Sequence, residues 1–171
     1  MRKFKRGHAE IRGIVDAPAA DVWDLLTDWG GIERWWIKPG EGGHPGFDIA
    51  SIELVGEPSQ VPRTRVLRQV TGSAVDETLM LQNNETLRIY YSMVSRPNPG
   101  GAELRREFEN YFATTTVDGL STGQALMTFK SEFDVTESAD LDLIRSMFEG
   151  FYSDAILQGF RRYFAKPSTK S

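Results

Sequence analysis

One stretch near the end of the chain decides the fold: residues 138–165, SADLDLIRSMFEGFYSDAILQGFRRYFA. It contains no proline, and its apolar side chains recur at the spacing of one helix face: Leu141, Ile144, Phe148, Tyr152, Ala155, Ile156 and Tyr163. Ser138 can cap the first turn, and Pro167 stops the helix. The sequence therefore predicts one long amphipathic helix from Ser138 to Ala165.

The first third of the chain is predicted to form one strand and two short helices. Apolar and polar residues alternate from His8 to Asp16, as they do in a half-buried strand. Ala19–Thr27 has the pattern of a short amphipathic helix, and Asp28–Ile37 is predicted to form a second one. Residues 39–46 are rich in glycine and proline and are expected to form a loop.

Six more strands are expected between that loop and the long helix: 47–55, 63–70, 74–81, 86–94, 106–117 and 124–135. Turn-forming residues separate them, so consecutive strands should pair as antiparallel hairpins. Such a sheet must bury one face, and the long helix is the only large apolar element that can cover it. The sequence thus predicts an α+β domain over residues 8–166, a curved seven-stranded antiparallel sheet around the helix with a small-molecule pocket between them.

Length and composition limit the function classes. The 171 residues fit one domain, with a flexible basic end at 1–7 and a tail at 167–171. The net charge of −4 argues against nucleic-acid binding, and the absence of cysteine excludes disulfides and thiol chemistry. With two histidines, a metal site is not expected, and we predict no cofactor. No apolar run is long enough to span a bilayer, so we expect a soluble, cytoplasmic protein without an integral membrane segment.

Eight short phrases, in this order, carry a family resemblance: 15–23, 28–35, 64–67, 77–79, 89–94, 110–114, 131–134 and 149–152. Together they span nearly the whole chain, from about residue 8 to 165. The chain resembles the Bet v 1-like, START-related superfamily (SRPBCC), and in particular its polyketide cyclase/dehydrase type 2 branch. The resemblance implies a helix-grip fold with an internal cavity for a hydrophobic ligand.

Arg65 and Glu77 are the candidate polar anchors of that cavity. They lie on two strands joined by a tight turn, and in relatives that bind hydrophobic acids the matching residues point into the cavity. A buried charge needs a partner or a ligand group. Arg65 can therefore meet an anionic ligand oxygen, or the two side chains can form a structural ion pair. A two-residue turn at Gly72–Ser73 would instead place Arg68 opposite Glu77.

The candidate cavity walls come from the sheet and from the helix. Tyr111 has a hydroxyl that needs a partner when buried, and Met93 adapts its shape to its surroundings. The apolar helix face can be ordinary core, but the resemblance places it over the cavity; its residues are Phe148, Tyr152 and Ile156. Trp29, Trp35 and Trp36 are expected near the mouth, where they can plug the end of the sheet or gate the pocket.

Three functions remain open at this point. The leading one is binding, transport or sensing of a small hydrophobic molecule, such as a polyketide, lipid or isoprenoid. The second is a cyclase, dehydratase or isomerase in the same cavity, with Glu77, Arg65 and Tyr111 as candidates, although no second carboxylate or histidine is placed to assign catalytic residues. The third is a protein-interaction module with a ligand-gated loop at Thr71–Ala74 or Pro97–Gly101.

Overall fold

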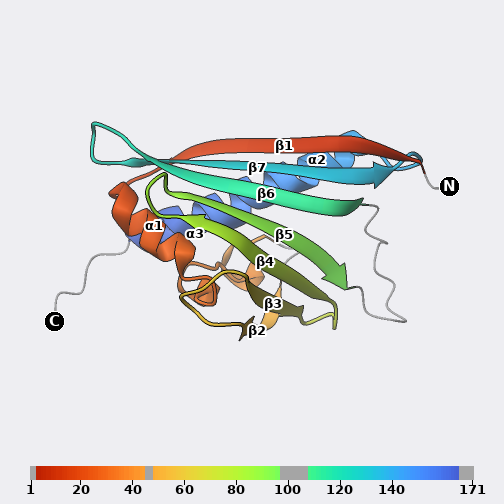
Figure 1. The fold of residues 1–171 in the computed structure, drawn as a ribbon, viewed down its shortest axis with the longest axis horizontal. Coiled ribbons are helices and arrows are strands. Elements are labelled where there is room, and N and C mark those ends of the chain that lie inside the picture. Colours follow the sequence, from red (N-terminus) through yellow and green to blue (C-terminus); the bar gives the residue numbers. More distant parts are fainter. Residues whose placement is uncertain (1–2, 45–47, 97–107, 166–171) are drawn as a thin grey trace.

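The computed structural model describes residues 3–44, 48–96 and 108–165. They form one seven-stranded antiparallel sheet in the order β1-β7-β6-β5-β4-β3-β2, with the C-terminal helix packed along one face (Figure 1). The strands are β1 (Phe4–Val15), β2 (Ile49–Val55), β3 (Arg63–Gln69), β4 (Ala74–Asn83), β5 (Arg88–Arg96), β6 (Phe108–Gly119) and β7 (Ala125–Thr136). The predicted helix-grip architecture is confirmed.

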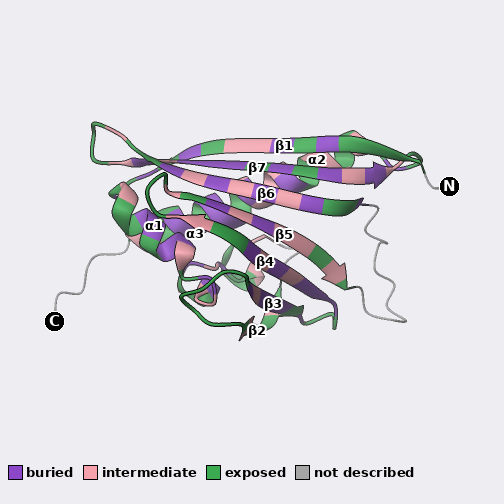
Figure 2. Cartoon of the chain, viewed as in Figure 1, coloured by how far each residue is buried: buried purple, intermediate pink, exposed green. Residues whose placement is uncertain are grey.

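The strand register confirms the predicted hairpins and corrects one boundary. β1 begins at Phe4 instead of His8, because Phe4–Gly7 continue the ladder with Phe133–Thr136 of β7. The flexible basic end expected over residues 1–7 is therefore wrong for residues 4–7. Along much of the strands, buried residues alternate with more exposed ones (Figure 2).

The two short helices after β1 differ in length from each other. The first, α1 (Ala19–Thr27), has the predicted bounds. The second is the 3₁₀ helix η1 (Ile32–Arg34), which is shorter than the predicted 28–37 because Gly30 and Gly31 favour a turn before it. A further 3₁₀ turn, η2 (Pro39–Glu41), lies in the predicted loop.

The long C-terminal helix is continuous but has three parts: α2 (Leu141–Gly150), a π-helical segment η3 (Phe151–Leu157) and α3 (Gln158–Ala165). Its cap is Asp140, not Ser138 as predicted. The Asp140 carboxylate accepts hydrogen bonds from the backbone N–H groups of Asp142 and Leu143 at 3.0 and 3.1 Å, which satisfies two donors of the first turn.

Two glycines let the second half of this helix approach its neighbours. A Cβ at Gly13 of β1 would lie 2.0 Å from the Leu157 side chain, and one at Gly159 would lie 2.6 Å from the carbonyl oxygen of Trp35. The absence of a side chain at these two positions therefore lets η3 approach β1 and lets α3 approach the segment at Trp35. Within the described residues, no helix is long and apolar enough to cross a membrane.

Candidate functional site

Four of the predicted site residues form one row across the inner face of the sheet. Arg65 of β3 pairs directly with Glu77 of β4, Glu77 with Met93 of β5, and Met93 with Tyr111 of β6. Direct cross-strand partners lie on the same face, so the four side chains are neighbours beneath the helix. The alternative register is wrong, because Arg68 pairs with Ala74.

Arg65 and Glu77 form a buried ion pair at one end of this row. Arg65 Nε donates to Glu77 Oε2 at 2.5 Å, and the two side chains are only 8% and 4% exposed. Charges withdrawn from water to this extent are tolerated when they are paired and hydrogen-bonded. The row therefore begins with a neutral pair of charges inside the domain.

Trp29 completes the surroundings of this pair. The guanidinium carbon of Arg65 lies 3.8 Å from the centroid of the Trp29 ring, and the indole N–H donates to the carbonyl oxygen of Glu77 at 3.0 Å. The backbone oxygen of Trp29 also accepts a hydrogen bond from Arg65 Nη1 at 3.5 Å. The sequence placed Trp29 near the mouth, but its contact with the pair could not be foreseen from periodicity.

At the other end of the row, tyrosine side chains come together. The hydroxyls of Tyr111 and Tyr152 share a hydrogen bond, and Tyr91 packs beside Tyr111 with ring centroids 6.4 Å apart. Burial raises the pKa of all three phenols, and the nearby Glu77 carboxylate raises each pKa further. They are therefore neutral hydrogen-bonding groups at physiological pH. Sequence reasoning did not identify Tyr91 as a site residue. Tyr91 lies two residues before Met93 on β5 and therefore on the same face of the sheet.

On the helix side of the site, aromatic side chains of the helix pack directly against aromatic side chains of the sheet. Phe148 lies 4.9 Å from Tyr111 and 4.7 Å from Phe133 between ring centroids, and Tyr152 stacks on Phe129 at 5.7 Å. Ile156 is buried in the same core. All seven predicted residues thus lie between sheet and helix. The predicted pocket, however, is filled here by contacts between its proposed walls.

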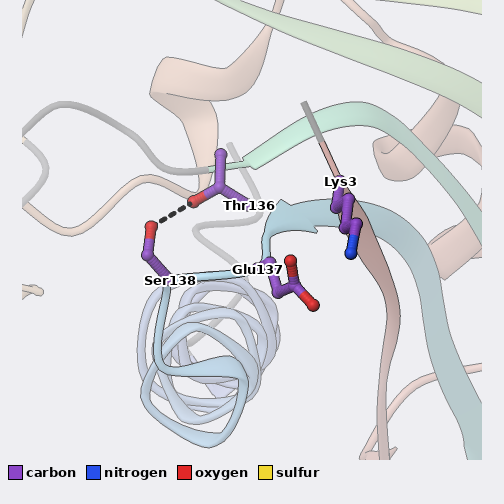
Figure 3. A pocket seen from close by; sticks show the side chains of 4 residues that line it. All are labelled: Lys3, Thr136, Glu137 and Ser138. Atoms are coloured by element: carbon purple, nitrogen blue, oxygen red, sulfur yellow. Dashed lines mark hydrogen bonds between the residues drawn. The ribbon is translucent and has the colours of Figure 1, made fainter. Parts of the chain in front are cut away.

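Two hollows in the described part of the chain lie away from this interior. An open depression of about 490 Å³ is lined by Lys3 and by Thr136, Glu137 and Ser138, where β7 leads into the helix (Figure 3). A cleft of about 50 Å³ lies between Trp36 and the end of α3 at Arg162. Neither is lined by a residue of the row, so neither is the predicted pocket.

The chemistry available in the interior is hydrogen bonding and charge pairing in apolar surroundings. In the described part of the chain, no group of three His, Asp or Glu side chains is placed to hold a metal ion. The Glu77 carboxylate is engaged by Arg65, and the phenols are protonated. The site can therefore orient a small molecule through a few polar contacts.

The fold and this interior define a helix-grip protein, and the comparison with family models gives the family. Residues 7–165 match the family described as polyketide cyclase/dehydrase and lipid transport. The chain belongs to that family. No curated protein sequence matches the chain.

Solved structures share the fold at low sequence identity. XoxI from Bacillus cereus is 18% identical, with a TM-score of 0.69 over 93% of this chain and 96% of that one. A protein from Thermobifida fusca is 23% identical, with a TM-score of 0.66 over 91% and 92%. Truncated norcoclaurine synthase from Thalictrum flavum is 17% identical, with a TM-score of 0.66 over 98% and 97%.

Proposed function

We propose that the chain binds a small hydrophobic molecule between its sheet and its C-terminal helix. The observation that carries this proposal is the row of polar side chains inside an apolar core: the Arg65–Glu77 pair at one end and the Tyr111 hydroxyl, bonded to Tyr152, at the other. Ligand sites are typically apolar interiors with a few polar groups that fix orientation.

A purely structural role explains this arrangement less well. Buried ion pairs add little net stability, and apolar side chains of similar volume often replace them without loss. Here the charged and phenolic groups lie together beneath one helix, although the surrounding core is aromatic and aliphatic. The family description, which includes lipid transport, supports a hydrophobic ligand. Norcoclaurine synthase from Thalictrum flavum, a similar fold, has been solved with dopamine and hydroxybenzaldehyde.

A ligand enters this filled interior by displacement of α2. Phe148 is the one buried residue of that helix, whereas Leu143 and Met147 are 67% and 46% exposed. The next segment, η3, buries Tyr152, Ala155, Ile156 and Leu157 and is π-helical, a geometry frequent at functional sites. An outward movement of α2 about η3 would withdraw Phe148 from Tyr111 and open the row to a ligand.

The experiment is native mass spectrometry of the protein purified from its own host, followed by thermal shift with a library of hydrophobic compounds. We expect a co-purifying small molecule that is lost in Tyr152→Phe. Tyr90→Phe is the matched control, because Tyr90 stacks on Phe112 on the opposite face of the sheet. Preparations that are always empty, together with no library compound that raises the melting temperature, would exclude the proposal.

Catalysis in the same interior is an alternative function, because the family description also names cyclases and dehydrases. Glu77 or Tyr111 would have to act as acid or base in a cyclisation or dehydration. Neutralising Glu77 should then abolish turnover while sparing binding, and an equal loss of both would count against an enzyme. The interaction-module alternative stays a prediction: the turn at Thr71–Ala74 is described, but Pro97–Gly101 lies outside the described residues.

A further inference from the structure

The charge balance of the interior indicates which molecules it can hold. We infer that the site takes an uncharged hydrophobic molecule that presents a carbonyl or hydroxyl oxygen to Tyr111 and Tyr152, and that it discriminates against carboxylates of the same shape. This inference rests on the proposed function and specifies its ligand class. It also replaces the initial hypothesis that Arg65 meets an anionic ligand oxygen.

Two of the five N–H donors of Arg65 bond to protein groups, and the Glu77 carboxylate neutralises its charge. Its Nε donates to Glu77, its Nη1 donates to the backbone oxygen of Trp29, and the Trp29 ring lies over the guanidinium carbon. A carboxylate that approached Arg65 would meet the Glu77 carboxylate beside it. Because the pair is neutral as a whole, it offers an anion no net attraction to replace the water that the anion loses on burial.

The other buried cation on this face is committed elsewhere. Arg63, two residues along β3, donates to the backbone oxygen of Thr27 at 3.0 Å, to Gln60 O at 2.9 Å and to Gln82 Oε1 at 2.7 Å. Thr27 is the last residue of α1, where carbonyl groups lack helical partners and the helix dipole favours a positive charge. Both terminal nitrogens of Arg63 are thus bonded to groups at the end of α1 and on its neighbouring segments.

The phenols, in contrast, have a donor to spare. Tyr91 also hydrogen-bonds to Tyr111. Three hydroxyls joined by two hydrogen bonds use two of their three protons, so the tyrosine group retains one O–H for an external acceptor. Burial raises the pKa of all three phenols, so that proton stays in place at physiological pH. A carbonyl oxygen accepts such a bond without bringing a charge into the core.

The test compares acetylnaphthalene, ethylnaphthalene and naphthoate, all substituted at the same ring carbon, by calorimetric titration at neutral pH. Acetylnaphthalene and naphthoate have the same number of non-hydrogen atoms, ethylnaphthalene has one fewer, and the three differ in the acceptor and the charge. We expect acetylnaphthalene to bind at least about tenfold more tightly than naphthoate. Tyr152→Phe should lower the affinity for acetylnaphthalene to that for ethylnaphthalene. Tyr90→Phe, on the outer face of the sheet, should leave the ranking of the three affinities unchanged.

A second variant should shift the relative affinities in the opposite direction, towards naphthoate. Glu77→Gln removes the negative charge beside Arg65 and should improve the binding of naphthoate relative to acetylnaphthalene. If this variant does not fold, the wild-type ranking and Tyr152→Phe still decide. Naphthoate that binds wild type as tightly as acetylnaphthalene, or more tightly, would overturn the inference and leave the binding function intact. Failure of all three probes to bind would also overturn the inference, whereas the proposed function is excluded only by empty preparations together with no response to the hydrophobic library.

Discussion

The indole of Trp29 lies over the guanidinium of Arg65, with the guanidinium carbon 3.8 Å from the ring centroid. The same indole donates its N–H to the carbonyl oxygen of Glu77. One side chain from the segment after α1 therefore contacts both members of the buried ion pair. The site is held together by three separate parts of the chain: β3, β4 and the connection that follows α1.

Trp29→Phe should destabilise the domain by about 1–2 kcal/mol, because it removes one buried hydrogen bond and weakens the cation–π contact. Urea unfolding followed by circular dichroism measures the change. Trp23→Phe is the control: the Trp23 indole N–H also donates a hydrogen bond, to Asn84 Oδ1 at 3.2 Å, but in a partly buried position remote from Arg65. An equal loss in both variants would mean that the contact with Arg65 contributes nothing measurable.

Breaking the Arg65–Glu77 pair from one side should cost about 3–5 kcal/mol, because either variant leaves an uncompensated charge in the core. Arg65→Met and Glu77→Leu are the single changes. The double variant should recover most of the lost free energy of unfolding, since it leaves no charge behind. The measurement is a double-mutant cycle in urea.

The Arg96–Asp76 pair is the matched control for that cycle. It also joins neighbouring strands, with Arg96 Nη2 and Asp76 Oδ1 2.5 Å apart, but its side chains are 48% and 28% exposed. Exposed pairs contribute at most about 1 kcal/mol. Equal coupling energies for the two pairs would contradict the distinction between a buried site and a surface contact.

The buried phenols should make the domain sensitive to alkali. The pKa values of Tyr91, Tyr111 and Tyr152 are raised in the folded state by burial. Above the unfolded value of about 10, the unfolded chain releases these protons while the folded chain retains them, so the free energy of unfolding falls as pH rises. Below that pH both states are protonated, and the stability contribution is complete.

Urea unfolding at a series of pH values from 8 upward measures this slope. Tyr111→Phe and Tyr152→Phe should each make it shallower, because each removes one group that titrates differently in the two states. Tyr90→Phe, on the outer face of the sheet, is the control and should leave the slope unchanged. A slope that none of the inner variants changes would show that other groups cause the alkaline loss.

The sequence contained the signals for the fold because they are local. Turn residues marked the hairpins, and the tight turn between the two strands allowed Arg65 to be paired with Glu77 as one of two registers. Helix boundaries were less certain: both Ser138 and Asp140 can cap, and only the path of the chain after β7 favours Asp140.

The contacts of the site could not be predicted in the same way, because they depend on residues far apart in the chain. Trp29 reaches Glu77, 48 positions away, through the path that the chain takes after α1. The fit of Phe148 against Tyr111 depends on side-chain volumes and on the π-helical turn, and neither follows from hydrophobic periodicity. The sequence therefore predicted residues on the facing sides of sheet and helix, but not that their side chains would fill the space between them.

The entry route leads to the last prediction, which concerns Gly150 at the junction of α2 and η3. Its backbone is helical, with φ −61° and ψ −40°, and a Cβ there would meet no atom within 4 Å. Gly150→Ala should therefore be tolerated and should favour the helical form by about 1 kcal/mol. If α2 opens by unwinding at this point, the added helix propensity makes opening rarer. Hydrogen exchange in α2 should then slow about fivefold, and ligand association should slow with it.

Gly40→Ala tests whether that effect is specific to the junction. Gly40 also has open space around its Cβ position but lies in η2, outside the long helix. In wild type, the amides of α2 should exchange faster than those of η3 and α3, because α2 buries one residue and the later segments bury several. Uniform protection along the whole helix, or equal effects of the two alanine variants, would refute the opening of α2, because a rigid α2 would keep Phe148 in place against Tyr111.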